Sequence, residues 1–593
     1  MRFVAIAFAG TSLILAGCGG GGGVNSTPNP APTPVPTPAP TPVPTPTPTP
    51  GVAVNTDLNN LVASQSFVND AVFNRTSYTA TGIGEVQDGG RTQLTIAYDA
   101  ASRSYTLTVP GTSETFGAAE YVGAEGGLYR DFQRETATTA SFFSIGTPSL
   151  EGERSYRYVN GGYWQRNLRK PDGEMELSFY PFTFGLSTAA ANLPRSGTAG
   201  YAIDLFGFYT NLRQTSGSRV VTGDGTINVD FSKAQLQLDG SVFSYDFVNG
   251  GRDQATLPFS GTGTIAADAS FSGAFQLFSA SKFAGRFYGP RAEELGAVFW
   301  SEDPDEHFEG TIVGQQADDV PRTNFLLTDL VADQEFRIIR MLYDTHGRLG
   351  YSTDGSYSYI SDISQRDRAP VFRPSDRIAS LSSPEYTVYG TTHAGNSYQL
   401  GLATPGQVEG VRLYYASFGE ISILSGPDLN TTSGAYSPMS NNQYFTYGLT
   451  PSVRVMTPSG HGIYNGIVIG RAINSVDNWS VSGTSLFNLN FQDGTLSALF
   501  KMAGTSLRGG AALIMPDLVV NDGYVNFDNG GLSGPISLAT SGQGSATLGH
   551  FAGQLYGPTG EELGGIARFS LYNFGGTDAS TEVALVALGS REP

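Results

Sequence analysis

Short runs in which hydrophobic and polar residues alternate recur along most of the chain, and glycine-containing turns separate them. In one such run Ile227, Val229 and Phe231 alternate with polar neighbours, which predicts a strand with one buried face. Residues 92–98 and 104–109 alternate in the same way and predict a hairpin. Many short strands joined by glycine turns indicate an all-β body, either a filled antiparallel barrel or a sandwich.

The second half of the chain repeats blocks of the first half in the same order. The matched blocks, with their shifts, are 182–186 with 445–449 (445 − 182 = 263), 223–231 with 483–491 (483 − 223 = 260) and 283–296 with 551–564 (551 − 283 = 268). Nearly constant shifts indicate homologous segments separated by small loop insertions. The period is far longer than a solenoid unit, so we expect two similar globular lobes.

The third block contains the most specific motif, an aromatic-Gly-Pro corner followed by Glu-Glu-Leu-Gly. Its residues are Gly285, Tyr288, Gly289, Pro290, Glu294 and Gly296 in the first copy, and Gly553, Tyr556, Gly557, Pro558, Glu562 and Gly564 in the second. Paired carboxylates are also the residue type of acid and base catalysis. Because the pairs recur at the same corner of both copies, we interpret them as structural, with a carboxylate capping backbone amides after the proline. We expect the two tyrosines to pack in the barrel with a partner for each hydroxyl.

At these residues the chain resembles the β-barrel domain of the transferrin-binding protein B family of surface lipoproteins. Residues 194–201, Pro-Arg-Ser-Gly-Thr-Ala-Gly-Tyr, match a second motif of that family, and residues 458–462 match it more loosely. The resemblance implies an all-β fold with two lobes, each pairing an antiparallel handle domain with an eight-stranded antiparallel β-barrel. It also implies a binding protein, not an enzyme, that works beside a TonB-dependent receptor and is exported by a surface-lipoprotein translocon.

Residues 1–18 have the pattern of a lipoprotein signal peptide. Arg2 precedes an apolar run that is too short to span a bilayer as a mature helix. Leu15 to Cys18 form a lipobox, which predicts cleavage before Cys18 and attachment of lipid to it. Cys18 is the single cysteine of the chain, so it cannot form an internal disulfide. Gly19 follows, which is typical of lipoproteins sorted to the outer membrane.

Residues 19–51 form a glycine- and proline-rich tether. Repeated Thr-Pro and Val-Pro pairs favour an extended polyproline II conformation and cannot pack a core. At about 3.1 Å per residue the run from Pro28 to Pro50 spans on the order of 70 Å and holds the folded body away from a membrane. We divide the rest into a first handle (52–182), a first barrel (183–316), a second handle (317–442) and a second barrel (443–593).

Charge and motifs exclude several classes of function. The net charge of −19 argues against nucleic acid or an anionic membrane surface as the principal partner. The sequence has no Gly-x-Ser-x-Gly elbow, no His-Glu-x-x-His helix and no P-loop. The five histidines are scattered without ligand spacing. We therefore expect no catalytic residues, no metal site and no cofactor, although a haem site built from one histidine with a tyrosine or methionine stays open.

The candidate ligand-binding residues form the most basic and aromatic stretch of this acidic chain. They are Arg154, Tyr156, Arg157, Tyr158, Tyr163, Trp164 and Arg166. These residue types are enriched at binding hot spots. An ordinary amphipathic hairpin, with arginines outside and aromatics inside, explains the same pattern. The resemblance places the binding face on the first lobe and so favours a role for this stretch in binding.

Together these features predict an outer-membrane-anchored, surface-exposed lipoprotein that binds a protein or small ligand, an iron carrier or haem, for iron acquisition. A surface adhesin or structural lipoprotein without an uptake role would use the lipobox and tether equally well. The lipobox and the terminal Arg-Glu-Pro oppose an integral outer-membrane barrel. A hydrolase has no residue constellation in its favour.

Overall fold

The computed structural model describes residues 53–79, 82–123, 129–146, 154–211, 218–246, 256–301, 303, 305–340, 347–361, 369–427, 441–451, 460–527, 529–539, 547–572 and 580–592. Residues 1–52, which hold the expected signal peptide, Cys18 and tether, lie outside these ranges. In the described part the protein is built from antiparallel strands, and the helices are short 3₁₀ turns such as Ala190–Asn192.

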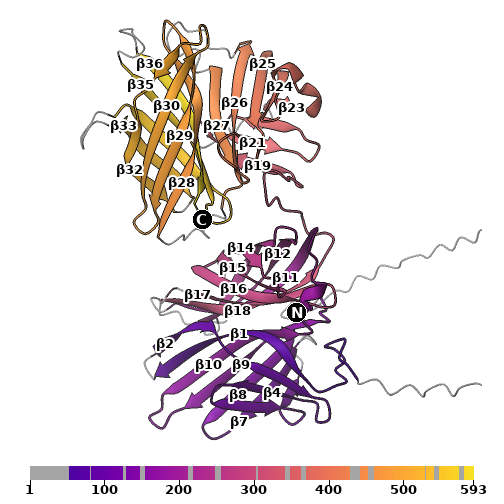
Figure 1. Ribbon diagram of the computed structural model, residues 1–593. Helices are drawn as coiled ribbons and strands as arrows, with labels where there is room; N and C mark the ends of the chain where they lie inside the picture. The colour runs from indigo at the N-terminus through magenta and orange to yellow at the C-terminus, as the bar shows by residue number, and fades with distance from the viewer. Residues whose placement is uncertain are drawn as a thin grey trace, which may run out of the picture. The chain divides into compact units, whose positions relative to one another are not determined.

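The first handle is a ten-stranded antiparallel sheet (Figure 1). Its strands are β1 (Gln65–Thr79), β2 (Gly82–Arg91), β3 (Thr95–Asp99), β4 (Ser104–Val109), β5 (Thr112–Phe116), β6 (Tyr121–Gly123), β7 (Tyr129–Glu135), β8 (Thr139–Gly146), β9 (Val159–Arg169) and β10 (Met175–Gly185). The expected hairpin of residues 92–109 is present as β3 paired with β4. Aromatic side chains, among them Phe143, Trp164 and Phe182, fill the core of this sheet.

The first barrel is closed and has eight strands, as the resemblance implied. Its strands are β11 (Thr198–Asn211), β12 (Ser218–Asp230), β13 (Gln235–Asp246), β14 (Leu257–Ile265), β15 (Ser270–Gln276), β16 (Ala280–Tyr288), β17 (Glu294–Ser301) and β18 (Glu306–Gln316). Closure comes from pairing of β11 with β18. Phenylalanines that include Phe271, Phe275, Phe283 and Phe299 fill the interior, so the barrel is a packed core.

The second handle consists of two antiparallel sheets. The four-stranded sheet contains β19 (Gln334–Arg337), β21 (Arg348–Tyr351), β22 (Tyr357–Ile360) and β23 (Val371–Phe372). The five-stranded sheet contains β20 (Ile339–Arg340), β24 (Tyr386–His393), β25 (Asn396–Ala403), β26 (Ala416–Ser425) and β27 (Asn442–Gly448). Side chains from both sheets, including Phe336, Leu349 and Phe445, share one apolar cluster.

The second barrel repeats the first. Its strands are β28 (His461–Ile473), β29 (Asn478–Asn490), β30 (Thr495–Ser506), β32 (Leu518–Asn526), β33 (Gly531–Leu538), β34 (Gly549–Tyr556), β35 (Glu562–Leu571) and β36 (Thr581–Arg591). Pairing of β29 with β30 closes the ring, and the short β31 (Ala512–Ile514) adds to β30. Both lobes are therefore a handle followed by an eight-stranded barrel.

The handle–barrel boundaries differ from those expected from the sequence. The expected boundary at 182/183 falls inside β10, which pairs with β9 along its whole length to Gly185. The expected boundary at 442/443 falls at the start of β27, which pairs with β26 of the handle. The first strands of the barrels begin only at Thr198 and His461.

Within each lobe the handle packs against the same two barrel strands. In the first lobe β9 and β10 contact β17 and β18 (Figure 1). In the second lobe β26 and β27 contact β35, and β27 also contacts β36. Both faces of β10 are thus covered, and Ser178 to Gly185 are all buried. We call each of these contact regions a handle–barrel joint. No helix within the described ranges has the length and hydrophobicity that crossing a lipid bilayer requires.

Candidate functional site

The Glu-Glu-Leu-Gly motif of the first lobe lies at the handle–barrel joint. The turn before β17 holds Gly289 at a φ of 87°, a conformation that glycine adopts without strain. Glu294, 1% exposed, then points out of the barrel toward the handle. Its carboxylate accepts N–H bonds from Arg157 and Tyr158, each at 2.8 Å, and from Val159 at 2.9 Å. We call this carboxylate with its three donors the latch. Burial raises the pKa of Glu294, and the three N–H donors oppose that shift.

The second lobe has the same latch. Glu562 is 3% exposed. It accepts N–H bonds from Tyr414 at 2.7 Å, Tyr415 at 2.9 Å and Ala416 at 2.8 Å. Burial raises the pKa of this carboxyl to about 7, against the effect of the same three donors. An ionised carboxylate that accepts three backbone N–H bonds is held by strong, charge-assisted interactions.

The two glutamates of each pair have different tasks. Glu293 accepts the N–H of Arg291 at 2.7 Å, and Glu561 accepts the N–H of Thr559 at 2.9 Å. The first glutamate of the pair therefore caps the turn after the proline, whereas the second holds the handle. A buried tyrosine fixes the same turn from inside each barrel: Tyr201 donates to the carbonyl of Ala292, and Tyr464 to that of Gly560, both at 2.6 Å.

The ring of a handle tyrosine covers the glycine of each corner. A Cβ atom on Gly289 would lie 2.7 Å from the ring of Tyr158, and one on Gly557 would lie 2.9 Å from the ring of Tyr415. The motif tyrosines, Tyr288 and Tyr556, are fully buried, but in the handle–barrel joint and not in the barrel interior, where the sequence placed them. The hydroxyl of Tyr556 lies 3.3 Å from Thr446 Oγ1. The two corner glycines, Gly289 and Gly557, are thus required by close approach of the handle as well as by the turn.

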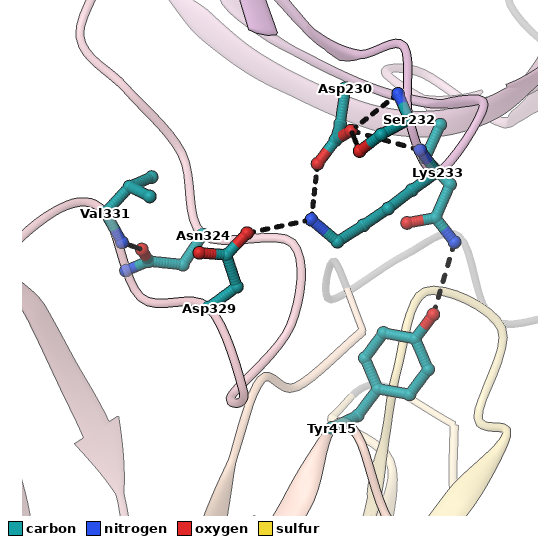
Figure 2. A network of polar contacts seen from close by, with 8 residues as sticks. Asp230, Ser232, Lys233, Asn324, Asp329, Val331 and Tyr415 are labelled. Atoms are coloured by element: carbon teal, nitrogen blue, oxygen red, sulfur yellow. Dashed lines mark hydrogen bonds and ion pairs between the residues drawn. The ribbon is translucent and has the colours of Figure 1, made fainter. Parts of the chain in front are cut away.

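The first segment of each handle is also duplicated, a repeat that the sequence comparison above missed. Asn55 Oδ1 accepts the N–H groups of Val62 and Ala63, and Asn324 Oδ1 accepts those of Val331 and Ala332, as Figure 2 shows for Val331. The signal in the sequence is Asn-x-x-Leu-x-x-Leu-Val-Ala-x-Gln-x-Phe at a shift of 324 − 55 = 269. Seven of its thirteen positions are identical, so this repeat is visible in the sequence once the first segments of the two handles are compared.

In the first lobe, side chains also tie the handle to the barrel. Asp70 of β1 pairs with Arg286 of β16, with Nε–Oδ2 at 2.8 Å. Arg154 forms an ion pair with Asp204 of β11, and Tyr156 donates to the same carboxylate at 3.0 Å. Burial raises the pKa of Asp204, and the neighbouring Arg154 opposes the shift.

A buried carboxyl forms the third side-chain tie of this joint. Asn74 Nδ2 of β1 donates to Glu309 Oε1 of β18 at 2.6 Å, and the glutamate is 4% exposed. Burial raises the pKa of Glu309 to about 8, and the amide of Asn74 opposes the shift.

The predicted ligand-binding stretch does not form one surface patch. Tyr156 and Trp164 are 2% and 0% exposed, so neither side chain is available to a partner. Tyr163 packs on Phe206 of the barrel with ring centroids 5.9 Å apart. Alternation along β9 explains the division, because successive side chains of a strand point to opposite faces. The amphipathic-hairpin interpretation is also incomplete, because both faces of β9 are covered: Trp164 lies in the handle core and Tyr163 packs on the barrel.

All three arginines of this stretch are paired with acids of the same lobe. Arg166 contacts Glu114 at 2.8 Å, and Arg157 contacts Asp57 at 3.3 Å. Arg157 keeps 57% of its side chain exposed and lies over the ring of Tyr158 at 5.3 Å. Arg157 and Tyr158 are therefore the members of the predicted set that present a cation and an aromatic ring together outside the handle core.

The histidines are not brought together by the fold. His307 is buried at 4% exposure on β18, and His393, His461 and His550 lie on β24, β28 and β34. His346 lies outside the described residues. Within the described ranges no group of three or more His, Cys, Asp or Glu residues is placed to hold a metal ion.

These observations define a bilobed all-β protein in which each lobe latches a handle to a filled eight-stranded barrel. Residues 193–316 match the family described as the C-lobe and N-lobe beta barrels of Tf-binding protein B. The first barrel is therefore similar to this family's barrel domain, and the chain is a bilobed protein similar to transferrin-binding protein B.

The chain is also similar to individual proteins. Transferrin-binding protein B of Haemophilus influenzae is 29% identical over 167 residues, which cover 25% of this chain and 26% of the relative. The match thus spans about a quarter of the relative's length. A crystal structure of a transferrin-binding protein B double mutant from Haemophilus parasuis is 14% identical, covering 88% of this chain and 95% of that one, with a TM-score of 0.26. The isotype 1 protein from Neisseria meningitidis is 15% identical, covering 76% and 89%, with a TM-score of 0.26.

Proposed function

We propose that this protein is a lipid-anchored, surface-exposed binding protein that captures an iron carrier or haem at the outer membrane for a TonB-dependent receptor. The observation that carries the proposal is the match of residues 193–316 to the barrels of Tf-binding protein B. The lipobox at Cys18 and the proline-rich tether support it, because together they would hold the lobes at a distance from the membrane that bears the lipid.

The packed interiors of the barrels support capture on an outer surface. A small-molecule site is usually a concave, largely preformed cavity. Here aromatic side chains fill the first barrel, and the second has a comparable core that includes Phe487, Phe500 and Phe551. We therefore propose that the ligand docks outside the barrels, with the first lobe as the contact surface and with Arg157 and Tyr158 at its edge.

The test is capture of a defined ligand by the chain without its lipid. A chain with Cys18→Ser is immobilised and exposed to iron-loaded transferrin, then separately to haem. Saturable binding of either ligand supports the proposal, and absence of binding to both removes the iron assignment. Arg157→Ala is expected to weaken binding by at least threefold if the first-lobe surface is used. Arg169→Ala is the matched control, since that arginine belongs to the same handle and is 65% exposed.

A surface adhesin is the second candidate, because the tether would serve it equally well. Growth under iron limitation separates the two functions. Deletion of the gene is expected to slow growth on the captured iron source and to leave growth on free iron salts unchanged. Equal growth of the deletion and parent strains on both sources would favour the adhesin.

A further inference from the structure

The two latches are identical, so they do not determine which handle binds which barrel. Glu294 and Glu562 each bind three consecutive backbone N–H groups, and a backbone N–H carries no sequence information. Either handle therefore fits either latch. We propose that a set of buried side chains beside the latch makes each handle specific for its own barrel.

The registers of the sheets fix which positions of the two joints correspond. Asp70 pairs with Thr183, and Ile339 pairs with Thr446, the position 263 residues later. In the barrels, Asp204 lies three residues after Tyr201, and Ile467 lies three residues after Tyr464. The next strand follows the same register, since Glu309 pairs with Phe208 and Ala584 pairs with Arg471.

At these positions the first lobe has charged or polar side chains, and the second lobe has apolar ones except for Gln554. The ties of the first lobe are Asp70–Arg286, Arg154–Asp204 and Asn74–Glu309. The second lobe has Ile339 at the place of Asp70, Gln554 at that of Arg286, Val411 at that of Arg154, Ile467 at that of Asp204 and Ala584 at that of Glu309. Ile339, Val411 and Ala584 belong to one buried apolar cluster, and Ile467 packs against it.

At another position of the joint the chemistry is reversed. Tyr163 and Phe208 meet edge to face in the first lobe, with ring centroids 6.1 Å apart. The corresponding residues of the second lobe are Glu420 and Arg471, whose charged atoms lie 3.6 Å apart. Burial raises the pKa of Glu420, and Arg471 opposes that shift. Each lobe thus carries ionic and apolar pairs in a pattern that the other lobe does not match.

Exchange of the handles would break these pairs. The second handle on the first barrel would leave Arg286 opposite Ile339 and Asp204 opposite Val411. The first handle on the second barrel would place Arg154 against Ile467 and Arg471 against Tyr163. Burial of a charge without its partner is strongly unfavourable, whereas the matched pair costs little. Such unpaired charges are an effective means of rejecting a wrong partner.

A disulfide competition in the whole chain tests this proposal. A Cβ atom built on Gly161 of the first handle lies 3.6 Å from the Cβ of Thr311 in the first barrel, within the usual range for a disulfide of about 3.5–4.5 Å. The position in the second barrel that corresponds to Thr311 is Val586, as its pairing with Ile469 shows. The test uses a chain with four substitutions: Cys18→Ser, Gly161→Cys, Thr311→Cys and Val586→Cys. When this chain refolds from urea under oxidising conditions, the cysteine at position 161 can form a disulfide with either barrel.

Peptide mass spectrometry then gives the ratio of the own-lobe disulfide (161–311) to the cross-lobe disulfide (161–586). With the native joint we expect a ratio of at least ten. With Asp204→Ile, Arg286→Gln and Glu309→Ala added, the first barrel resembles the second, and we expect the ratio to fall at least fivefold. An unchanged ratio would overturn the proposal, because proximity along the chain alone would then select the barrel. A native ratio near one would overturn it as well.

A charge-reversed pair controls for loss of folding. Arg154→Asp combined with Asp204→Arg keeps an ion pair across the joint with its polarity inverted, and should preserve most of the own-lobe preference. The converse change, Ile467→Asp with Gln554→Arg, gives the second barrel the charges of the first and should raise the cross-lobe disulfide at least threefold. These substitutions leave the first lobe unchanged. If they do not increase the cross-lobe disulfide, the proposal is contradicted.

Discussion

Glu294 and Glu562, which lie 268 residues apart, hold the two handles through the same three-donor arrangement. All six N–H···O distances fall between 2.7 and 2.9 Å. Both carboxylates follow the same glycine–proline corner and are almost completely buried. The Glu-Glu-Leu-Gly motif therefore joins the handle to the barrel in each lobe.

Replacement of Glu294 by Gln should lower the free energy of unfolding of the first lobe by about 2–4 kcal/mol. The amide loses the charge that strengthens three hydrogen bonds and turns an NH₂ group toward N–H donors. Urea unfolding followed by tryptophan fluorescence measures the change. Trp479→Phe confines the signal to the first lobe, since the other two of the three tryptophans, Trp164 and Trp300, lie there.

Glu293→Gln is the matched control for that change. Its carboxylate caps an exposed turn through Arg291, so we expect a loss below about 1 kcal/mol. Equal effects of the two substitutions would contradict the assignment of Glu294 to the joint.

Removal of the tyrosine hydroxyl that supports each corner should weaken each lobe separately. Tyr201→Phe and Tyr464→Phe each delete a buried hydrogen bond of 2.6 Å to a backbone carbonyl. Each should cost about 1–3 kcal/mol, because the carbonyl is left buried without that donor. Limited proteolysis of the two lobes measures the effect. A change that sensitises both lobes equally would show that the corners are not independent.

The raised pKa of Glu309 predicts that the first lobe loses stability as the pH rises. Its folded-state pKa of about 8 lies above the ordinary value of 4.5, so folding favours the protonated carboxyl. The stability from this group is fully present below about pH 4.5 and is lost as the pH rises through 8, by up to about 5 kcal/mol. Burial also raises the pKa values of Asp204 and Glu294, which add to the trend in the same direction.

Glu309→Gln isolates the part of this trend that belongs to one carboxyl. The amide preserves shape and hydrogen bonding to Asn74 but cannot ionise. The urea concentrations at the midpoint of unfolding at pH 5 and at pH 8.5 should therefore differ less in the variant than in the parent chain. An identical pH dependence in both chains would refute the buried, protonated state of Glu309.

Substitution of Cys18 by Ala should release the protein from the membrane. Without the cysteine no acyl chain can be attached, and anchoring by lipid depends on buried methylenes at roughly 0.8 kcal/mol each. Labelling with radioactive palmitate followed by cell fractionation measures this outcome. Retention of label or of membrane association in the variant would contradict the lipobox prediction.

The sequence predicted the barrels well because their signals are local. Alternation along single strands and the glycine–proline corner both depend on a few adjacent residues, and β11–β18 follow them. The end of each handle was misplaced because β10 is covered on both faces and so does not alternate. A strand that lies between a handle core and a barrel has the same hydrophobic pattern as a strand of either one.

The roles of Trp164 and Glu294 could not be predicted for a different reason. Aromatic residues are favoured both in cores and at binding surfaces, and only the tertiary fold shows that Trp164 is completely buried. The donors to Glu294 lie about 135 residues earlier in the chain and are backbone groups, which leave no trace in the side-chain sequence. Contacts of that kind become visible only in three dimensions.

Binding of an iron carrier is the most direct test of the account as a whole. The chain with Cys18→Ser, both lobes present, is immobilised on a biosensor and exposed to iron-loaded transferrin, iron-free transferrin and haem. The account predicts saturable, reversible binding of at least one iron-bearing ligand, which is recovered chemically unchanged. Absence of binding to all of them, or recovery of a cleaved or altered ligand, would contradict a protein that captures iron sources without transforming them.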